Sequence, residues 1–209
     1  MYDGKQYLCS MTSRMTPLDV ARMLRLRPET AHKGTMGHAL LVAGSAGVGG
    51  CAVLGAESCL RSGVGKLTVC TPECNRLLLQ LSVPEAVLRL LPRGGDAGTP
   101  WEAGEFARWQ AVGIGPGIGL LAVGLLHDVA ERSAGLPMVV DADALRILAV
   151  HPEWMPMLRG RAVLTPHGGE MQALASGILH ADAPLHTDSM LLAAAGRLAT
   201  EFRVCVVLK

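Results

Sequence analysis

Acidic and histidine side chains stand directly after two short apolar runs of this chain. Residues 139–145 read Val-Val-Asp-Ala-Asp-Ala-Leu, so the carboxylates of Asp141 and Asp143 lie two positions apart after an apolar segment. Residues 161–164 form a second short run, and Thr-Pro-His-Gly-Gly-Glu comes directly after it at 165–170. Ligand-binding groups in open α/β sheets lie at the carboxyl ends of strands. We therefore expect both segments to contribute to a ligand site.

Each polar residue of these segments also has a structural alternative. Asp143 could merely cap the next helix, because aspartate is a favoured N-cap and stabilises the first helical turn. Asp141 is nearer the strand end, which favours a functional role. His167 could donate to a ligand, stack on it or serve the turn alone, and Glu170 could hold a ligand, an ion or the helix start.

Two glycine-rich turns are the other candidate ligand-binding motifs of the chain. Residues 44–50 (Gly-Ser-Ala-Gly-Val-Gly-Gly) come after the segment His-Lys-Gly-Thr-Met-Gly-His at 32–38 and an apolar run. Between a strand and a helix, such glycines let backbone N–H groups approach an anion. Residues 113–119 (Gly-Ile-Gly-Pro-Gly-Ile-Gly) allow a similar close approach. We expect all four motifs to converge on one crevice, although each glycine turn could form only a tight connection.

The elements that must position these motifs can be placed from alternating apolar runs and helical patterns. We expect strands at residues 39–43, 66–70, 86–90, 109–114, 137–140, 161–164 and 203–208. We expect helices at residues 17–26, 50–61, 73–81, 120–133, 142–150, 169–175 and 187–202. This alternation predicts βαβ units, a parallel sheet and right-handed crossovers. The expected organisation is one α/β domain over residues 17–209, with a tail or linker remnant at 1–16 and a surface loop at 92–100.

Composition narrows the possible partners. Half of the 209 residues are hydrophobic and only 3% are aromatic, which suits a buried parallel sheet with an aliphatic core. The net charge of +1 gives no reason to expect a nucleic acid or an anionic membrane as partner. No apolar run reaches the roughly 18 residues of a membrane span, and the N-terminus has no signal-peptide pattern, so we expect a cytoplasmic protein. The six cysteines contain no C-x-x-C pair, which favours reduced thiols over a metal site.

The motifs, in this order, resemble those of the NAD(P)H-hydrate dehydratase family of the ribokinase-like superfamily. The matching segments are His32-Lys33-Gly34, Arg61-Ser62-Gly63-Val64-Gly65, and residues 115–119, 141–145, 165–170 and 206–209. The resemblance covers nearly the whole chain from His32. It implies a three-layer α/β/α domain with a mostly parallel central sheet. Gly168 stands where the family usually has proline, and Arg146 where it usually has asparagine.

The resemblance also implies an activity, the repair of hydrated NADH or NADPH. In this reaction ADP or ATP would phosphorylate the added hydroxyl of the nicotinamide ring, and elimination of phosphate would restore the double bond. Mg²⁺ is the metal ion expected with the nucleotide. The resemblance further implies a homo-oligomer and an epimerase, fused or separate, that interconverts the two hydrate forms.

The same resemblance assigns roles to individual residues. Asp141 and Glu170 are the expected catalytic residues and would organise the polar centre, through water or a metal ion; no residue is assigned as a metal ligand. The expected substrate-binding residues line the crevice: Gly44, Ser45, Gly50, Cys51, Ala52, Gly115, Gly117, Asp143 and His167. Lys209 would begin the nucleotide-binding segment.

The resemblance stops at Lys209, before the G-x-GD element that cradles phosphates and supplies the base in this family. We therefore expect the C-terminal part of the domain to be missing, an exposed sheet edge or apolar face, and no turnover by these 209 residues alone. One alternative is a ribokinase-like kinase of thiazole or pyrimidine alcohols, which residues 141–145 and 165–170 disfavour. Another is a non-catalytic ligand-binding fragment. A dehydrogenase is disfavoured, because residues 44–50 lack the G-x-G-x-x-G spacing of dinucleotide-binding turns.

Overall fold

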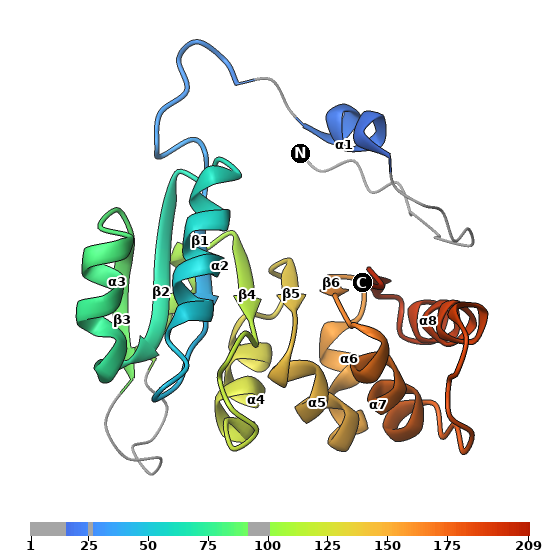
Figure 1. Ribbon diagram of the computed structural model, residues 1–209. Coiled ribbons are helices and arrows are strands. Elements are labelled where there is room, and N and C mark those ends of the chain that lie inside the picture. Colours follow the sequence, from blue (N-terminus) through green and yellow to red (C-terminus); the bar gives the residue numbers. More distant parts are fainter. Residues whose placement is uncertain (1–15, 25–26, 92–100) are drawn as a thin grey trace.

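The computed structural model describes residues 16–24, 27–91 and 101–209 (Figure 1). Within these ranges the chain forms one sheet of seven strands, in the order β3-β2-β1-β4-β5-β6-β7, and every neighbouring pair is parallel. The strands are β1 (His38–Val42), β2 (Lys66–Pro72), β3 (Val87–Leu91), β4 (Ala111–Ile114), β5 (Met138–Val140), β6 (Ala162–Leu164) and β7 (Cys205–Val206). The order reverses between β1 and β4. In open α/β sheets ligands bind at such a switch point.

Helices connect the strands and cover the sheet. They are α1 (Pro17–Met23), α2 (Gly50–Arg61), α3 (Arg76–Ser82), α4 (Val123–Arg132), α5 (Asp143–Val150), α6 (Met155–Leu158), α7 (Gly168–Ile178) and α8 (Asp188–Phe202). Helices α2 and α3 lie beside β1, β2 and β3, whereas α4 to α8 lie beside the other strands (Figure 1). A short 3₁₀ turn, η1 (Glu73–Asn75), links β2 to α3.

Successive residues of β1 place the two helical layers on opposite faces of the sheet. Leu40 and Val42 belong to the larger apolar cluster, which includes buried residues of α4, α5, α7 and α8. Leu41 packs instead against the smaller cluster, together with Ala52 and Ala56 of α2. Because neighbouring strand residues point to opposite faces, β1 is covered on both sides. The α/β/α architecture predicted from the sequence is therefore confirmed.

Most element boundaries agree with prediction, and the exceptions have local causes. Helix α2 has the predicted bounds, whereas β7 (Cys205–Val206) begins two residues later than predicted, after Arg203 ends α8 in the left-handed conformation with φ of 51°. Helix α4 begins at Val123 because a turn closes before it, with the Ala122 N–H donating to the Gly119 carbonyl. Helix α6 was not predicted, since four residues with a proline in the first turn carry no periodic pattern.

Some predictions fall outside the described residues. The surface loop expected at 92–100 lies outside them, as does the tail apart from Thr16, whose side chain caps α1. Among the described residues, no helix is both long and apolar enough to cross a membrane.

An apolar side chain is exposed in the middle of the sheet, where Val139 of β5 is 45% accessible although Met138 and Val140 are buried.

Candidate active site at the carboxyl edge of the sheet

The acidic and threonine motifs are brought level by the register of the strands that precede them. Ile114 pairs with Val140, and Val140 pairs with Leu164. The backbone ladder continues one residue further, since the Asp141 N–H donates to the Ile114 carbonyl and the Thr165 N–H donates to the Val140 carbonyl. Asp141 and Thr165 therefore lie side by side at the carboxyl edge of the sheet, as predicted.

The two glycine turns meet at the switch point between β1 and β4. The Gly44 N–H donates to the Pro116 carbonyl at 2.8 Å, and the Cys51 thiol donates to the same carbonyl at 3.2 Å. Gly117 has φ of 64°, and a Cβ at this position would overlap the Cys51 sulfur. Burial raises the pKa of the Cys51 thiol, which keeps it protonated as a donor. Both turns thus form one continuous backbone wall, and only glycine fits at position 117.

Residues 141–143 contact the second glycine turn, at residues 115–119, through a side chain and through the backbone. The Asp143 carboxylate accepts a hydrogen bond from the Gly119 N–H at 2.9 Å. A Cβ on Gly115 would overlap the Asp141 carbonyl oxygen, so the two backbones pass in close contact. Between the two aspartates, Ala142 has φ of 51° and ψ of −123°, a strained conformation for a residue with a Cβ. The structure therefore gives Asp143 a role in shaping the turn, and its predicted contact with substrate stays a prediction.

Asp141 faces Lys209 across the strand ends. Lys209 Nζ lies 2.7 Å from Asp141 Oδ1, and the Lys209 N–H donates to the Pro166 carbonyl at 3.0 Å. Burial alone would raise the pKa of Asp141, but hydrogen bonds from Lys209, Thr165 and the Ala142 N–H lower it on balance. Among these hydrogen bonds, the one from Lys209 lowers the pKa of Asp141 most. An ionised carboxylate and an ammonium group thus share this part of the edge.

His167 and Glu170 cap the N-terminus of α7 by hydrogen bonds to each other's backbone N–H groups. His167 Nδ1 accepts hydrogen bonds from the Gly169 and Glu170 N–H groups, at 3.0 and 3.4 Å. Glu170 is buried, and its Oε2 accepts the His167 N–H while Oε1 lies 3.2 Å from His167 Nε2. A neutral ring with its proton on Nε2 satisfies all of these contacts. The helix-start alternative for Glu170 is therefore present in the structure, and its catalytic role remains a prediction.

Asn75 was missed by sequence reasoning although it reaches the same site from the end of β2. Its side-chain amide donates to Thr71 Oγ1 at 2.9 Å and to the Ser45 carbonyl at 3.4 Å. Asn75 is only 5% exposed, and Thr71 is fully buried. The available signal was a pair of polar residues four positions apart, at the end of an apolar strand.

The predicted substrate-binding residues of the first turn all lie at this edge. Ser45 is held by Asn75 through its carbonyl, and Gly50 begins α2. Ala52 is buried in the first turn of the same helix, where its Cβ would lie 3.3 Å from a Cβ on Gly44. The turn therefore packs on α2 as closely as its glycines allow.

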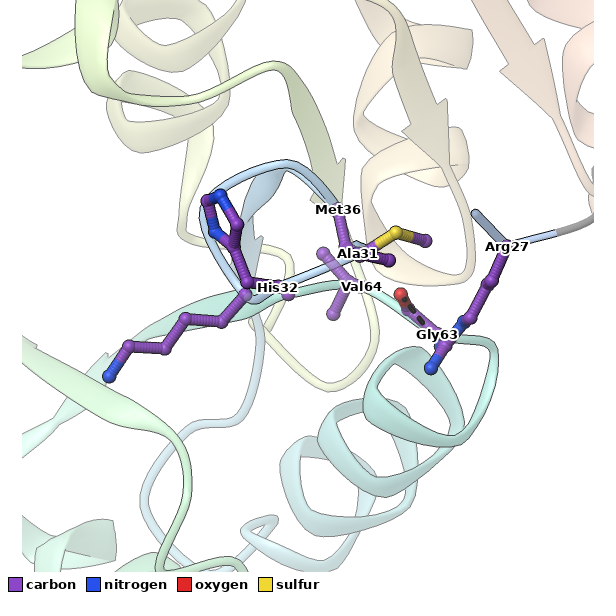
Figure 2. Close-up of a pocket in the computed structure, with 8 residues that line it drawn as sticks. Arg27, Ala31, His32, Met36, Gly63 and Val64 are labelled. Atoms are coloured by element: carbon purple, nitrogen blue, oxygen red, sulfur yellow. Dashed lines mark hydrogen bonds between the residues drawn. The ribbon is translucent and has the colours of Figure 1, made fainter. Parts of the chain in front are cut away.

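The segment 32–38 does not lie at the carboxyl edge of the sheet. It leads into β1 and packs at the amino end of the sheet against residues 61–65, with the Gly65 N–H donating to the Met36 carbonyl at 3.1 Å. A depression of about 250 Å³ lies there (Figure 2). Arg27 reaches the Gly63 carbonyl at 3.2 Å on one side of it, and His32 lies on the other side (Figure 2). The physical reason is that the full length of β1 separates segment 32–38, at its amino end, from the glycine turn at its carboxyl end.

The described part of the chain contains no cluster of three or more histidine, cysteine, aspartate or glutamate side chains that could hold a metal ion. The carboxyl edge offers instead a carboxylate paired with an ammonium group, and a glycine wall at the start of a helix. Such an arrangement suits a ligand that carries anionic groups such as phosphate.

Known proteins have sequences similar to that of this chain. The family model described as NAD(P)H-hydrate dehydratase matches residues 39–209. The bifunctional NAD(P)H-hydrate repair enzyme Nnr of Synechocystis sp. is 38% identical over 154 residues, which are 71% of this chain and 28% of that protein. The ADP-dependent (S)-NAD(P)H-hydrate dehydratase of Listeria monocytogenes is 31% identical over 181 residues, 85% of this chain and 62% of that protein.

Solved structures agree with the sequence relatives. The ADP/ATP-dependent NAD(P)H-hydrate dehydratase from Bacillus subtilis, co-crystallised with ATP and Mg²⁺, has a TM-score of 0.68 and 28% identity. The similarity covers 93% of this chain and 65% of that one. The ribokinase-like fold expected from the sequence is thus confirmed. This chain spans less than two thirds of the length of each of these three proteins.

Proposed function

This chain belongs to the NAD(P)H-hydrate dehydratase family, and on that premise we propose that it serves in the nucleotide-dependent repair of hydrated NADH or NADPH. The relatives from Synechocystis sp. and Listeria monocytogenes bear this activity in their names. The observation that carries the proposal is the meeting of two glycine turns, the Asp141 carboxylate and the Lys209 ammonium group at one edge of the sheet. The same edge would accept a phosphorylated cofactor.

The proposed chemistry makes a poor leaving group into a good one. Hydroxide leaves the nicotinamide ring reluctantly, whereas phosphate leaves readily while the ring nitrogen supplies electrons. The glycine wall around Gly44 and Gly117 would bind the ring, because backbone without side chains permits close approach. Lys209 uses one of its three N–H donors on Asp141, which leaves two for phosphate oxygens.

ADP or ATP is the proposed co-substrate, with Mg²⁺. The Bacillus subtilis protein was crystallised with ATP and Mg²⁺. Mg²⁺ usually takes one or two carboxylates, phosphate oxygens and water, so it needs no protein cage. Asp143 and Glu170 accept N–H groups of the turns they shape, whereas the nearest partner of Asp141 is a side chain that can be displaced. Asp141 is therefore the residue we expect to face the ion, which would offset phosphate charge when bound.

Further properties of the protein are proposed from its relatives alone. The Synechocystis relative is called bifunctional, which fits a second activity beside the dehydratase, and we expect that activity to be the epimerase. A homo-oligomer and a cytoplasmic location are likewise expectations from the family resemblance.

The test is an assay of the 209-residue chain with hydrated NADH. Restoration of NADH absorbance that requires ADP or ATP would support the proposal directly. Calorimetric binding of hydrated NADH without turnover would support the ligand-binding part alone and favour the non-catalytic alternative. Phosphorylation of a thiazole or pyrimidine alcohol, with no binding of hydrated NADH, would contradict the proposal. A Lys33→Gln variant at the amino end serves as the control, because it should match wild type in every assay.

A further inference from the structure

The glycine turn that forms one wall of the crevice has little to hold it in place from within. Gly44 and Gly47 have φ of 82° and 80°, and the Val48 N–H closes the turn on the Ser45 carbonyl at 3.0 Å. Gly49 caps α2 without any side-chain hydrogen bond. Glycine loses more conformational freedom than any other residue when it is fixed. Something outside the turn must therefore select its conformation.

Asn75 occupies the position from which the turn can be fixed. Its amide nitrogen would lie 2.9 Å from a Cβ built on Gly44, and its amide oxygen 2.7 Å from a Cβ built on Gly49. The side chain thus fills the space that both glycines leave open. Its two amide hydrogens are directed to Thr71 Oγ1, at 2.9 Å, and to the Ser45 carbonyl, at 3.4 Å. Thr71 is part of β2, so the contact ties the turn to the sheet.

We propose that Asn75 is a positioning residue for the substrate crevice, and that it sets the affinity for the hydrated nicotinamide ring by fixing the turn at residues 44–49. This inference rests on the proposed function. Without the amide, the Ser45 carbonyl keeps only the Val48 N–H of its own turn and loses its tie to β2, so the turn gains conformations that do not bind. A ligand must then select the competent conformation, and its apparent affinity falls by the competent fraction. The effect reaches the second turn because Gly44 donates to Pro116.

A purely structural role for Asn75 would be to end η1 and precede α3, where its side chain makes no capping hydrogen bond. Two further substitutions separate this role from positioning. Thr71→Val removes the acceptor in β2 and leaves the Ser45 contact, so a smaller loss is expected. Leu78→Ala, on α3, removes an apolar side chain that would lie 2.7 Å from a Cβ on Gly49, and it tests packing without a hydrogen bond.

The first measurement is hydrogen exchange followed by mass spectrometry on the full chain without ligand. In Asn75→Ala and Asn75→Asp we expect exchange in peptides covering residues 44–50 to rise about tenfold, as for the loss of one buried hydrogen bond. Peptides covering α5 should exchange as in wild type. Equal exchange at residues 44–50, or a rise of the same size in α5, would overturn the inference.

The second measurement is calorimetric binding of hydrated NADH and, separately, of ADP. The Asn75 variants should bind hydrated NADH about tenfold more weakly, corresponding to about one hydrogen bond, and ADP as wild type does. Unchanged binding of hydrated NADH by a folded variant, or the same loss in Leu78→Ala, would overturn the inference. If wild type itself does not bind hydrated NADH, the proposed function fails, while hydrogen exchange still decides the role of Asn75.

Discussion

At the amino end of the sheet, residues 32–37 and 61–65 pack against each other through glycines, much as residues 44–50 and 115–119 do at the carboxyl end. At both ends a Cβ on one glycine would overlap a backbone carbonyl, that of Lys33 for Gly65 and that of Asp141 for Gly115. The side chains differ. The amino end has cations such as Lys33 and Arg27, whereas the carboxyl end pairs a carboxylate with an ammonium group.

Glycine motifs alone therefore do not identify a binding site in this molecule. Close backbone approach is needed wherever two connections cross, with or without a ligand. The carboxyl end is distinguished because it gathers side chains of opposite charge from several strand ends around the switch point of the sheet. Paired substitutions, one at each end, can test this distinction.

The largest effect is expected from adding one methyl group at each end. Gly65→Ala and Gly115→Ala should each lower the free energy of unfolding by about 3 kcal/mol, because backbone must move to relieve the overlap. Only Gly115→Ala should also abolish binding of hydrated NADH. Urea unfolding and calorimetry on the folded fraction give both quantities. Loss of binding in Gly65→Ala at equal folded fraction would mean that the two ends are not functionally distinct.

The next largest effect is expected on ADP binding, when one lysine ammonium group is removed at each end of the sheet. Lys209→Gln is expected to weaken ADP binding about tenfold, roughly 1.4 kcal/mol, because a phosphate contact is lost. Lys33→Gln should leave ADP binding unchanged. Titration calorimetry at low ionic strength is the measurement, since salt screens such contacts. Equal weakening by both variants would place nucleotide binding outside the carboxyl edge.

Backbone strain gives a smaller contrast. Ala142 has positive φ at the carboxyl end, whereas Gly37 supplies positive φ at the amino end. Ala142→Gly should raise the free energy of unfolding by about 1 kcal/mol, because relief of strain exceeds the entropy lost on fixing glycine. The reverse change, Gly37→Ala, should lower it by about 1 kcal/mol. Thermal unfolding of both variants tests this, and a destabilised Ala142→Gly would show that residue 142 is unstrained.

As the pH falls, each end of the sheet should lose stability in its own pH range. Burial, Lys66 and Arg108 lower the pKa of His38 at the amino end, so stability is lost as pH falls below the unfolded value of 6.5. The lowered pKa of Asp141 contributes stability above its unfolded value of 3.8, which is lost as pH falls through the folded value. Urea midpoints against pH should lose the upper decline in His38→Gln and the lower one in Asp141→Asn. Unchanged profiles would contradict both assignments.

The sheet and its carboxyl-end motifs could be predicted because they depend on local pattern. Apolar runs spaced by helices predict parallel strands, and parallel strands bring Asp141 and Thr165 to one edge whatever the details of packing. Helices α4, α5, α7 and α8 along residues 120–202 could be predicted for the same reason, whereas the four-residue α6 could not. These features rest on periodicity, which a single sequence contains.

Other features depend on contacts between distant residues and could not be predicted. Asn75 lies 30 positions from Ser45, and nothing in the local sequence indicates that they touch. Whether Glu170 binds a ligand or caps α7 depends on the orientation of its carboxylate. In the structure this orientation is set by the hydrogen bond from the His167 N–H. The pairing of residues 32–37 with 61–65 likewise requires β1 and β2 to be already aligned.

The pairing of β1 with β4 has a consequence for how the molecule assembles. Ala39 pairs with Ala111, so the boundary on which both glycine turns meet joins segments far apart in the chain. Contacts of high sequence separation must overcome loop-closure entropy before they contribute stability. We therefore expect the crevice to form late in folding, after α2 has packed on β1 and β2. A chain caught before that event would hold secondary structure but recognise nothing.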